Sequence, residues 1–590
     1  MKYITKQIIA SILGTMLLAV AYTQEKSLLM GMKINRTTKI RYGIYKIYAT
    51  NDTDQPAILI EGNNITVDFN NITLKGSNTK RNPDEFVGVG ILIRNSRNVT
   101  IKNLKARGYK IALLAKNSDS LLLDNCDFSY NYRQHLRSTP EKEDLSDWMS
   151  YHQNGKDEWL RYGAAMYLRN CNSAIIRNCK VTGGQNALMM MECNDGMIYN
   201  NDFSFNSGIG LGLYRSNRNK VMYNKIIFNV RGYSHGIYNR GQDSAGILVY
   251  EQSSNNFFYK NSVTHCGDGF FLWAGQSTMD SGKGGCNDNI VMNNDFSFAP
   301  ANGVEATFSR NIISDNRLFG CDYGIWGGYS YESNFSNNKF RDNRIDIAIE
   351  HGQHNKITYN IFYDSKEAIR LWARTKQPDD PIAIGWGYAK FHDTKSHDYT
   401  IAFNNFSKCK TVLNIAETDK LNIFGNIYGP FEISNLIDST VTDLDTSLHD
   451  EMIKELSADT TVSIPEIQKP NDPFKNTGKL AGRKNILITE WGPYDFRSPI
   501  IWNTNPADTS DVISFDLLGP KGKWKIKSFR GVENISAMNG EFPASITAHK
   551  LKAERTDILI MLEYLGLSLT TPMGEKIQAN KSYKFSFKKN

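Results

Sequence analysis

Acidic and aromatic side chains recur in the middle of the sequence at equivalent places in a short apolar phrase. The phrases align on Gly246, Gly269, Gly303 and Gly324, with Asp346 and Ala368 in the same place. This alignment gives one column of Leu248, Phe271, Glu305, Trp326, Ala348 and Arg370, and a second of Tyr250, Trp273, Thr307, Gly328, Glu350 and Trp372. Glu251 and His351 directly follow the second column. Carboxylates can act as general acid and base, and flat rings can stack on sugar faces.

The two columns line up in space only if the chain winds in regular coils, and a repeat predicts such coils. Asn294, Asn316, Asn338 and Asn360 follow one another at a spacing of 22 residues, inside phrases such as IVMNNDF and IISDNRL. Short strand-like segments with this period fit a coil that rises about 4.8 Å per turn. We expect the stacked Asn side chains to hydrogen-bond between coils. A leucine-rich repeat would need a leucine-dense consensus, and a propeller a longer period.

The segment GILVYEQSSNNFFYKNSV, residues 246–263, resembles the repeats of the pectate-lyase-like superfamily of right-handed parallel β-helices. Members of that superfamily are mostly secreted proteins that act on polysaccharides. The resemblance implies an all-β solenoid and a carbohydrate ligand, without specifying a reaction.

Four regions are predicted along the 590 residues. Residues 1–21 have the basic start, the apolar run and the small residues of a signal peptide, which predicts a secreted or periplasmic protein. Residues 22–438 form the β-helix and residues 439–478 a linker. Residues 479–590 alternate like the strands of a small β-sandwich-like domain. No later segment is apolar over the length needed to span a bilayer, so we expect no membrane anchor.

Charge and cysteine content exclude other classes of protein. The 69 basic and 61 acidic residues are spread along the chain, so we expect no nucleic-acid binding. Most of the eight cysteines are expected to be free core thiols, and Cys266 and Cys286 are the best candidates for a bridge. The histidines lie at scattered spacings, so no metal and no other cofactor is predicted. We expect a monomer.

The leading hypothesis from the sequence is a glycoside hydrolase. One of Glu305 and Glu350 would protonate the leaving oxygen while the other activates water, with Glu251 in reserve. Two coils separate Glu305 from Glu350, about 10 Å along the axis, which suits inversion. Anchoring on Ile312 instead of Gly303 would move Glu305 into the Tyr250 column, so its register is open. The predicted substrate-binding residues are Trp273, Trp326, Trp372, Tyr250, Arg370, His351, Arg215 and Tyr214.

Two other functions fit the same columns. A polysaccharide lyase would use Arg215, Arg370 or Arg374 to neutralise a uronic acid. A non-catalytic glycan-binding protein would need the rings but not the carboxylates.

Four insertions interrupt the coils at residues 132–162, 228–245, 275–287 and 373–399. On a solenoid such loops tend to flank a binding face. They contain His135, Trp148, His152, Trp159, His235, Trp386, His392 and His397. Alternatively, these rings only anchor the loops over the columns.

Overall fold

The structure is a computed structural model. It describes residues 25–77, 81–139, 143–232, 243–374, 388–448, 450–457, 462–475, 480–505, 509–551, 557–578 and 581–587. The predicted signal peptide, His235 and Trp386 lie outside these residues.

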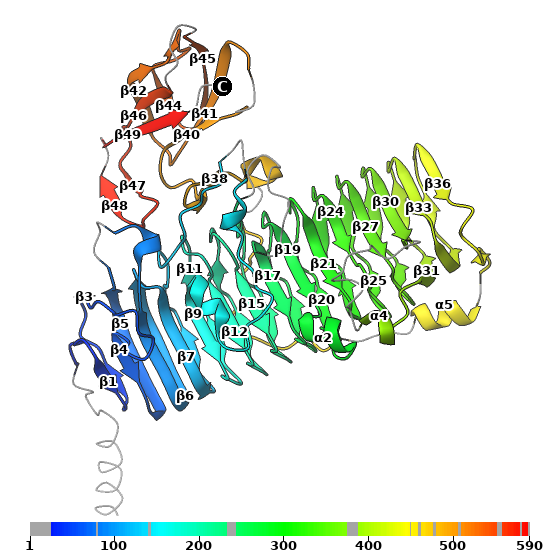
Figure 1. Cartoon of the computed structure of the whole chain (residues 1–590), viewed down its shortest axis with the longest axis horizontal. Helices are drawn as coiled ribbons and strands as arrows, with labels where there is room; N and C mark the ends of the chain where they lie inside the picture. Colours follow the sequence, from blue (N-terminus) through cyan, green and yellow to red (C-terminus); the bar gives the residue numbers. More distant parts are fainter. Residues whose placement is uncertain are drawn as a thin grey trace, which may run out of the picture.

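The chain from β1 (Met32–Ile34) to β37 (Leu444–Asp445) forms a right-handed parallel β-helix (Figure 1). The predicted fold class is therefore confirmed, and the solenoid continues beyond its predicted end at residue 438. Each complete coil contributes a strand to a first sheet, then to a second sheet and, in much of the solenoid, to a third. Strands of successive coils pair in parallel and in register.

Seven strands of the first sheet run through the central and later coils, and β36 (Ile433–Ile437) follows them as the last. They are β17 (Ala245–Tyr250), β19 (Asp268–Trp273), β21 (Asn302–Thr307), β24 (Tyr323–Trp326), β27 (Ile345–Glu350), β30 (Glu367–Trp372) and β33 (Thr411–Ile415). In earlier coils the sheet contains β7 (Ile111–Asp119), β9 (Ala164–Arg169), β12 (Leu188–Met191) and β15 (Leu211–Tyr214).

The second and third sheets complete these coils. The second contains β18 (Phe257–Tyr259), β20 (Asn289–Met292), β22 (Asn311–Ser314), β25 (Asn334–Ser336), β28 (Lys356–Thr358), β31 (Ser396–Ala402) and β34 (Thr418–Phe424). The third contains β23 (Arg317–Phe319), β26 (Lys339–Arg341), β29 (Ile361–Tyr363), β32 (Asn405–Ser407) and β35 (Ile427–Tyr428).

One elongated core fills the solenoid, and a ladder of asparagines runs along it. Alternate residues of each strand point inward, so the core extends from Leu28 to Ile423. Asn294, Asn316, Asn338 and Asn360 each donate from Nδ2 to the Oδ1 of the next ladder asparagine, at 3.1 to 3.2 Å. Each also donates Nδ2 to a main-chain carbonyl, as Asn316 does to Val291 at 2.8 Å. The predicted asparagine stacking is confirmed.

The C-terminal region forms two antiparallel four-stranded sheets that share one core. One sheet contains β40 (Ile500–Asn503), β41 (Val512–Leu518), β45 (Ala544–Lys550) and β43 (Val532–Glu533). The other contains β44 (Asn539–Glu541), β42 (Lys523–Arg530), β46 (Ile558–Tyr564) and β49 (Lys581–Phe587). This domain lies over the earlier coils (Figure 1).

The predicted linker is packed against the solenoid. After α5 (Asp450–Ser457), Val462 and Ile467 pack on the second sheet, and the Lys469 carbonyl accepts a hydrogen bond from Asn200 Nδ2 at 3.0 Å. The segment therefore connects the far end of the solenoid with the C-terminal domain along the outer surface of the β-helix.

The eight cysteines are all buried free thiols, so Cys266 and Cys286 do not form the candidate bridge. Among the described helices, none combines the length and the apolar character that a bilayer crossing needs.

Candidate active site

The strand pairing of the first sheet settles the register of the two columns. Glu305 pairs with Phe271 on one side and with Trp326 on the other, so it belongs to the Leu248 column. That column continues through Ala348 to Arg370, and Glu350 pairs with Trp372 in the neighbouring column. The alignment on Gly303 is confirmed, and the alternative alignment on Ile312 is wrong.

The earlier half of this face is covered by the first insertion. Met149, Tyr151 and Trp159 form a second apolar core against Tyr214, Tyr250 and their neighbours on the sheet. The Trp159 ring lies 5.4 Å from the Tyr214 ring and 6.5 Å from the Tyr250 ring, centroid to centroid. Tyr214 and Tyr250 are buried, so the prediction that their rings contact sugar is corrected: here the insertion packs over the columns.

Glu251 and Arg215 anchor the third insertion, residues 275–287. Arg215 Nη2 donates to Glu251 Oε1 at 3.1 Å, and the Ser277 hydroxyl of α2 (Gln276–Ser281) donates to the same oxygen. Gly275 has a φ of +95°, and a Cβ there would collide with Glu251 Oε2. Because Glu251 is buried beneath α2, it holds a loop in place and is not open to a ligand.

A pair of acidic residues lies at the end of the part of the face that the first insertion covers. Asp268 and Glu305 belong to adjacent coils, and both contact Asn302. The main-chain N–H of Asn302 donates to Asp268 Oδ1 at 2.8 Å, and its Nδ2 donates to Glu305 Oε2 at 2.9 Å. Asp268 is buried, whereas Glu305 is half-buried and has surface access. One asparagine therefore holds two carboxyl groups side by side.

The surroundings of this pair favour protonated carboxyl groups. Burial raises the pKa of Asp268 to about 7, against the hydrogen bonds from Asn302, and the charge of Asp243 adds to the increase. Burial, and next the charge of Asp268, raises the pKa of Glu305 well above its ordinary value. Two carboxylates this close in an apolar setting cannot both ionise cheaply. The pair thus supplies a neutral carboxylic acid near neutral pH.

Aromatic rings continue the face beyond Glu305. The Trp326 ring lies 5.1 Å from the Tyr323 ring and 5.5 Å from the Trp372 ring, centroid to centroid. All three are half-buried. Trp273 is also half-buried, and His152 of the first insertion packs edge-on against it at 5.6 Å. Half-buried rings of this kind can stack on a flat apolar ligand surface.

Glu350 lies two coils beyond Glu305 and forms an ion pair. Arg374 Nε contacts Glu350 Oε1 at 2.5 Å, and Trp372 Nε1 donates to the same oxygen at 3.0 Å. Arg370 pairs in the same way with Glu367, at 2.7 Å from Nε to Oε2. Both predicted cations thus have a carboxylate partner.

His351 has a positioning role instead of the predicted contact with substrate. It is 2% exposed, its Nδ1 lies 2.6 Å from the Thr394 carbonyl oxygen, and its ring stacks on Tyr329 at 4.7 Å. The main-chain N–H of Arg374 donates to Nε2 at 3.3 Å, and burial lowers the pKa of this histidine. A neutral His351 with its proton on Nδ1 therefore fastens the fourth insertion to its coil.

The third and fourth insertions also contact each other. His392, which follows α4 (Tyr388–Phe391), has Nε2 at 2.6 Å from the Gly282 carbonyl oxygen after α2. The two loops together flank the turns beside the half-exposed rings, as the sequence predicted for insertions on a solenoid.

Sequence reasoning missed Asp268, Asn302 and Tyr323. The signal for them is a third outward position, directly before the small residue of each phrase, which contains Asp268, Asn302, Tyr323, Ile345 and Glu367 in successive coils. Asn302, Tyr323 and Glu367 are half-buried at this position, whereas strict alternation would place it in the core.

Two family models match parts of the chain. The model described as a right-handed beta helix region matches residues 89–282, and the model described as periplasmic copper-binding protein (NosD) matches residues 279–378. Both matched segments lie within the observed solenoid. Among curated proteins, none matches the sequence significantly.

Several solved structures resemble the chain at low identity. The periplasmic alginate epimerase AlgG has 10% identity and a TM-score of 0.32, with 74% of this chain and 83% of the epimerase covered. A family 28 exopolygalacturonase from Yersinia enterocolitica has 10% identity and a TM-score of 0.36, with 69% and 79% covered. The surface protein and adhesin PfbA of Streptococcus pneumoniae has 14% identity and a TM-score of 0.30, with 71% and 89% covered. Similarity at this level does not identify a reaction.

Proposed function

We propose that the protein is a carbohydrate-active enzyme, and specifically a glycoside hydrolase. The observation that supports this most directly is the acidic pair, in which burial and the charge of Asp268 raise the pKa of Glu305, on a strand that pairs this half-buried residue with Trp326. Hydrolysis of a glycosidic bond needs a carboxylic acid of raised pKa to protonate the leaving oxygen.

In this mechanism Glu305 donates the proton and Glu350 is the second carboxylate. Asp268 tunes Glu305, since its charge opposes ionisation of its neighbour. The Glu350 carboxylate forms an ion pair with Arg374 and can activate a water molecule. The two side chains start about 10 Å apart along the axis, near the separation of inverting enzymes. Trp326, Trp372 and Tyr323 would bind the sugar faces.

The lyase alternative is less well supported. It needs a cation free to neutralise a uronate, and Arg215, Arg370 and Arg374 each pair with a carboxylate. Export of the protein is also part of the proposal, because the predicted signal peptide and the description of the NosD model both suit a protein outside the cytoplasm.

The first experiment screens the purified protein against neutral, acidic and sulfated glycans, with mass analysis of the products. Hydrolysis adds the mass of water at each cleavage, whereas a lyase forms an unsaturated product that absorbs in the near ultraviolet. On a cleaved substrate, Glu305→Gln should lower kcat by about 10² to 10⁴-fold. The control Glu533→Gln, at an exposed site in the C-terminal domain, should keep full activity.

The dependence of the rate on pH separates the role of Glu305, which donates the proton, from that of Asp268, which raises the pKa of Glu305. Activity needs protonated Glu305, so the rate should fall as pH rises through the Glu305 pKa. Asp268→Asn removes a charge that raises this pKa and should shift the alkaline limb to lower pH. Full activity in both Glu305→Gln and Glu350→Gln, or an unsaturated product, would overturn the proposal.

A further inference from the structure

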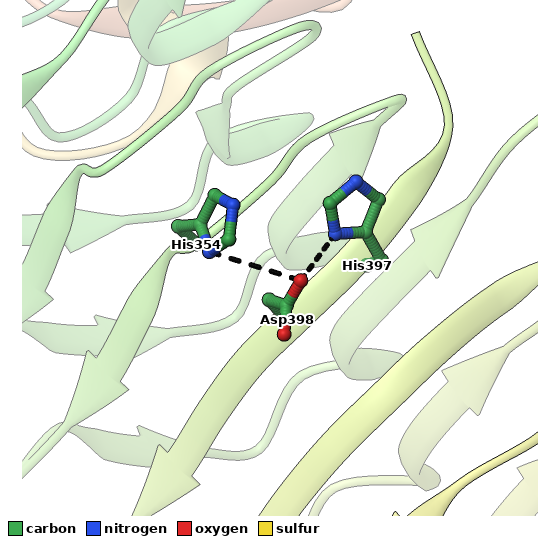
Figure 2. A group of neighbouring side chains, drawn as sticks. All are labelled: His354, His397 and Asp398. Atoms are coloured by element: carbon green, nitrogen blue, oxygen red, sulfur yellow. Dashed lines mark hydrogen bonds and ion pairs between the residues drawn. The ribbon is translucent and has the colours of Figure 1, made fainter. Parts of the chain in front are cut away.

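Two histidines and an aspartate converge on the outer side of the second sheet (Figure 2). His397 Nδ1 lies 2.5 Å from Asp398 Oδ2, and His354 Nδ1 lies 3.8 Å from the same oxygen. One ligand atom from each of the three residues lies within 4.8 Å of the others. This clustering was not predicted, because most of the fourth insertion lies between His354 and His397 in the sequence.

The backbone of the coils brings these residues together. His354 and Asp398 occupy the same turn on successive coils, and both have a positive φ, at 52° and 57°. The main-chain N–H of His354 donates to the His397 carbonyl at 3.2 Å, which fixes the register between the two turns. The positions of all three residues therefore follow from the solenoid rather than from a mobile surface loop.

A fourth residue orients His397. His397 Nε2 lies 2.9 Å from Asp393 Oδ2, and the other carboxylate oxygen of Asp393 accepts the Lys395 N–H at 2.9 Å. A carboxylate that accepts the proton of one ring nitrogen turns the other nitrogen into a ligand, as in many histidine metal sites. This contact directs His397 Nδ1 toward Asp398 and His354.

We propose that His354, His397 and Asp398 bind one divalent transition-metal ion, with Asp393 as the residue that positions His397. Imidazole and carboxylate together suit Zn²⁺ and Cu²⁺. Metal–ligand bonds of about 2.0 to 2.2 Å require ligand atoms about 3.3 Å apart. His397 and Asp398 would move slightly apart to admit the ion, and the more exposed His354 would move in.

Further coordination positions would be accessible from the surface. His354 and Asp398 line a hollow together with Glu332, Asn334, Lys356 and Asn422. Lys420 Nζ approaches Asp398 Oδ2 at 3.9 Å, and this exposed cation would swing away when the ion binds. Three protein ligands with open positions beside a hollow can accept water or a small ligand.

The ion would also anchor the fourth insertion. Asp393 and His397 lie on the segment that His351 fastens through the Thr394 carbonyl. A metal bound across His354 and His397 would tie this segment to the coil from its other side. This inference does not depend on hydrolase activity at the first sheet.

The test uses the full-length protein, stripped with a chelator and titrated separately with Zn²⁺ and Cu²⁺ by calorimetry. We expect one ion per chain, and a higher melting temperature in the presence of the ion. His354→Ala and His397→Ala should each weaken binding by at least about 100-fold, and Asp393→Asn by about 10- to 100-fold. The control His549→Ala, on β45 of the C-terminal domain, should bind as the wild type does.

Folding of the variants is checked without metal, where His354→Ala should melt as the wild type because its side chain is 57% exposed. For bound Cu²⁺, the paramagnetic resonance spectrum should show coupling to two nitrogens, and to one in His354→Ala. If neither ion binds, or if the wild type and both histidine variants bind it with equal affinity, the site is refuted.

Discussion

At the scale of single residues, the solenoid tolerates ionisable groups in places that the repeat otherwise gives to small residues. Asp346 occupies the position of Gly246, Gly269, Gly303 and Gly324 in the earlier coils, and its side chain is fully buried. Asn343 Nδ2 and the Ser365 hydroxyl donate to its Oδ1 at 2.8 and 2.7 Å. Two donors do not replace bulk water, so burial raises the pKa of Asp346 to about 8.

This buried acid predicts a pH-dependent stability. The folded pKa lies above the ordinary value of 3.8, so the folded protein holds a proton that the unfolded chain releases. Stability should therefore fall as pH rises from about 4 to about 8, by a contribution on the order of 5 kcal/mol. Asp346→Asn should remove this contribution and be more stable than the wild type at pH 8.

Urea denaturation at pH 5, 6.5 and 8 checks this prediction. The matched control is Asp315→Asn, at an exposed position on an earlier coil, which should keep the wild-type dependence on pH. Parallel curves for the wild type and Asp346→Asn would show that Asp346 ionises freely.

At the scale of elements, the asparagine ladder fixes how coils stack. Asn316 is buried, donates to Val291 O and Asn338 Oδ1, and accepts the main-chain N–H of Asn294 at 2.9 Å. Each buried partner left without a hydrogen bond costs free energy. Asn316→Ala should therefore lower the free energy of unfolding by about 3 kcal/mol.

Thermal and urea unfolding followed by circular dichroism measure this loss. Lys339→Ala, at an exposed site on β26, is the control and should change stability by less than about 0.5 kcal/mol. Equal stability of the two variants would mean that water replaces the missing side chain in the ladder.

The elements also explain what the sequence could and could not predict. Periodicity predicted the fold, the asparagine stacking and the pairing of Glu305 with Trp326, because each depends only on the repeat. It could not predict that Trp159 covers Tyr214 and Tyr250, since the surface on which an insertion packs is not determined by the repeat. The proximity of His354 and His397 could not be predicted for the same reason.

At the scale of the whole molecule, the C-terminal domain is held against the earlier coils by arginines. Arg133, which is 4% exposed, donates from Nη2 to the Pro572 carbonyl at 2.7 Å, and its guanidinium lies 5.9 Å from the centre of the Trp491 ring. Arg497 Nη1 lies 3.4 Å from the Tyr130 hydroxyl. The contact thus includes a buried Arg133 and a half-buried Arg497.

Arg133→Ala should loosen this contact without unfolding the solenoid. It removes the hydrogen bond to Pro572 and packing on Trp491, so proteases should cut the segment around residues 462–475 several-fold faster. Limited proteolysis with mass analysis gives the rate, and Arg530→Ala, exposed on β42, is the control. Equal cleavage rates in the two variants would contradict the proposed role of Arg133.

The ladder continues across the fourth insertion. Asn360 donates to Asn404 at 3.1 Å across 44 residues, in the same way as Asn338 donates to Asn360 across 22. The register between successive coils therefore does not depend on the length of the chain between two ladder asparagines. Loops of new length and chemistry can be exchanged by mutation or by design while the carboxylates and rings of the face stay in position, so ligand preference can evolve separately from the fold.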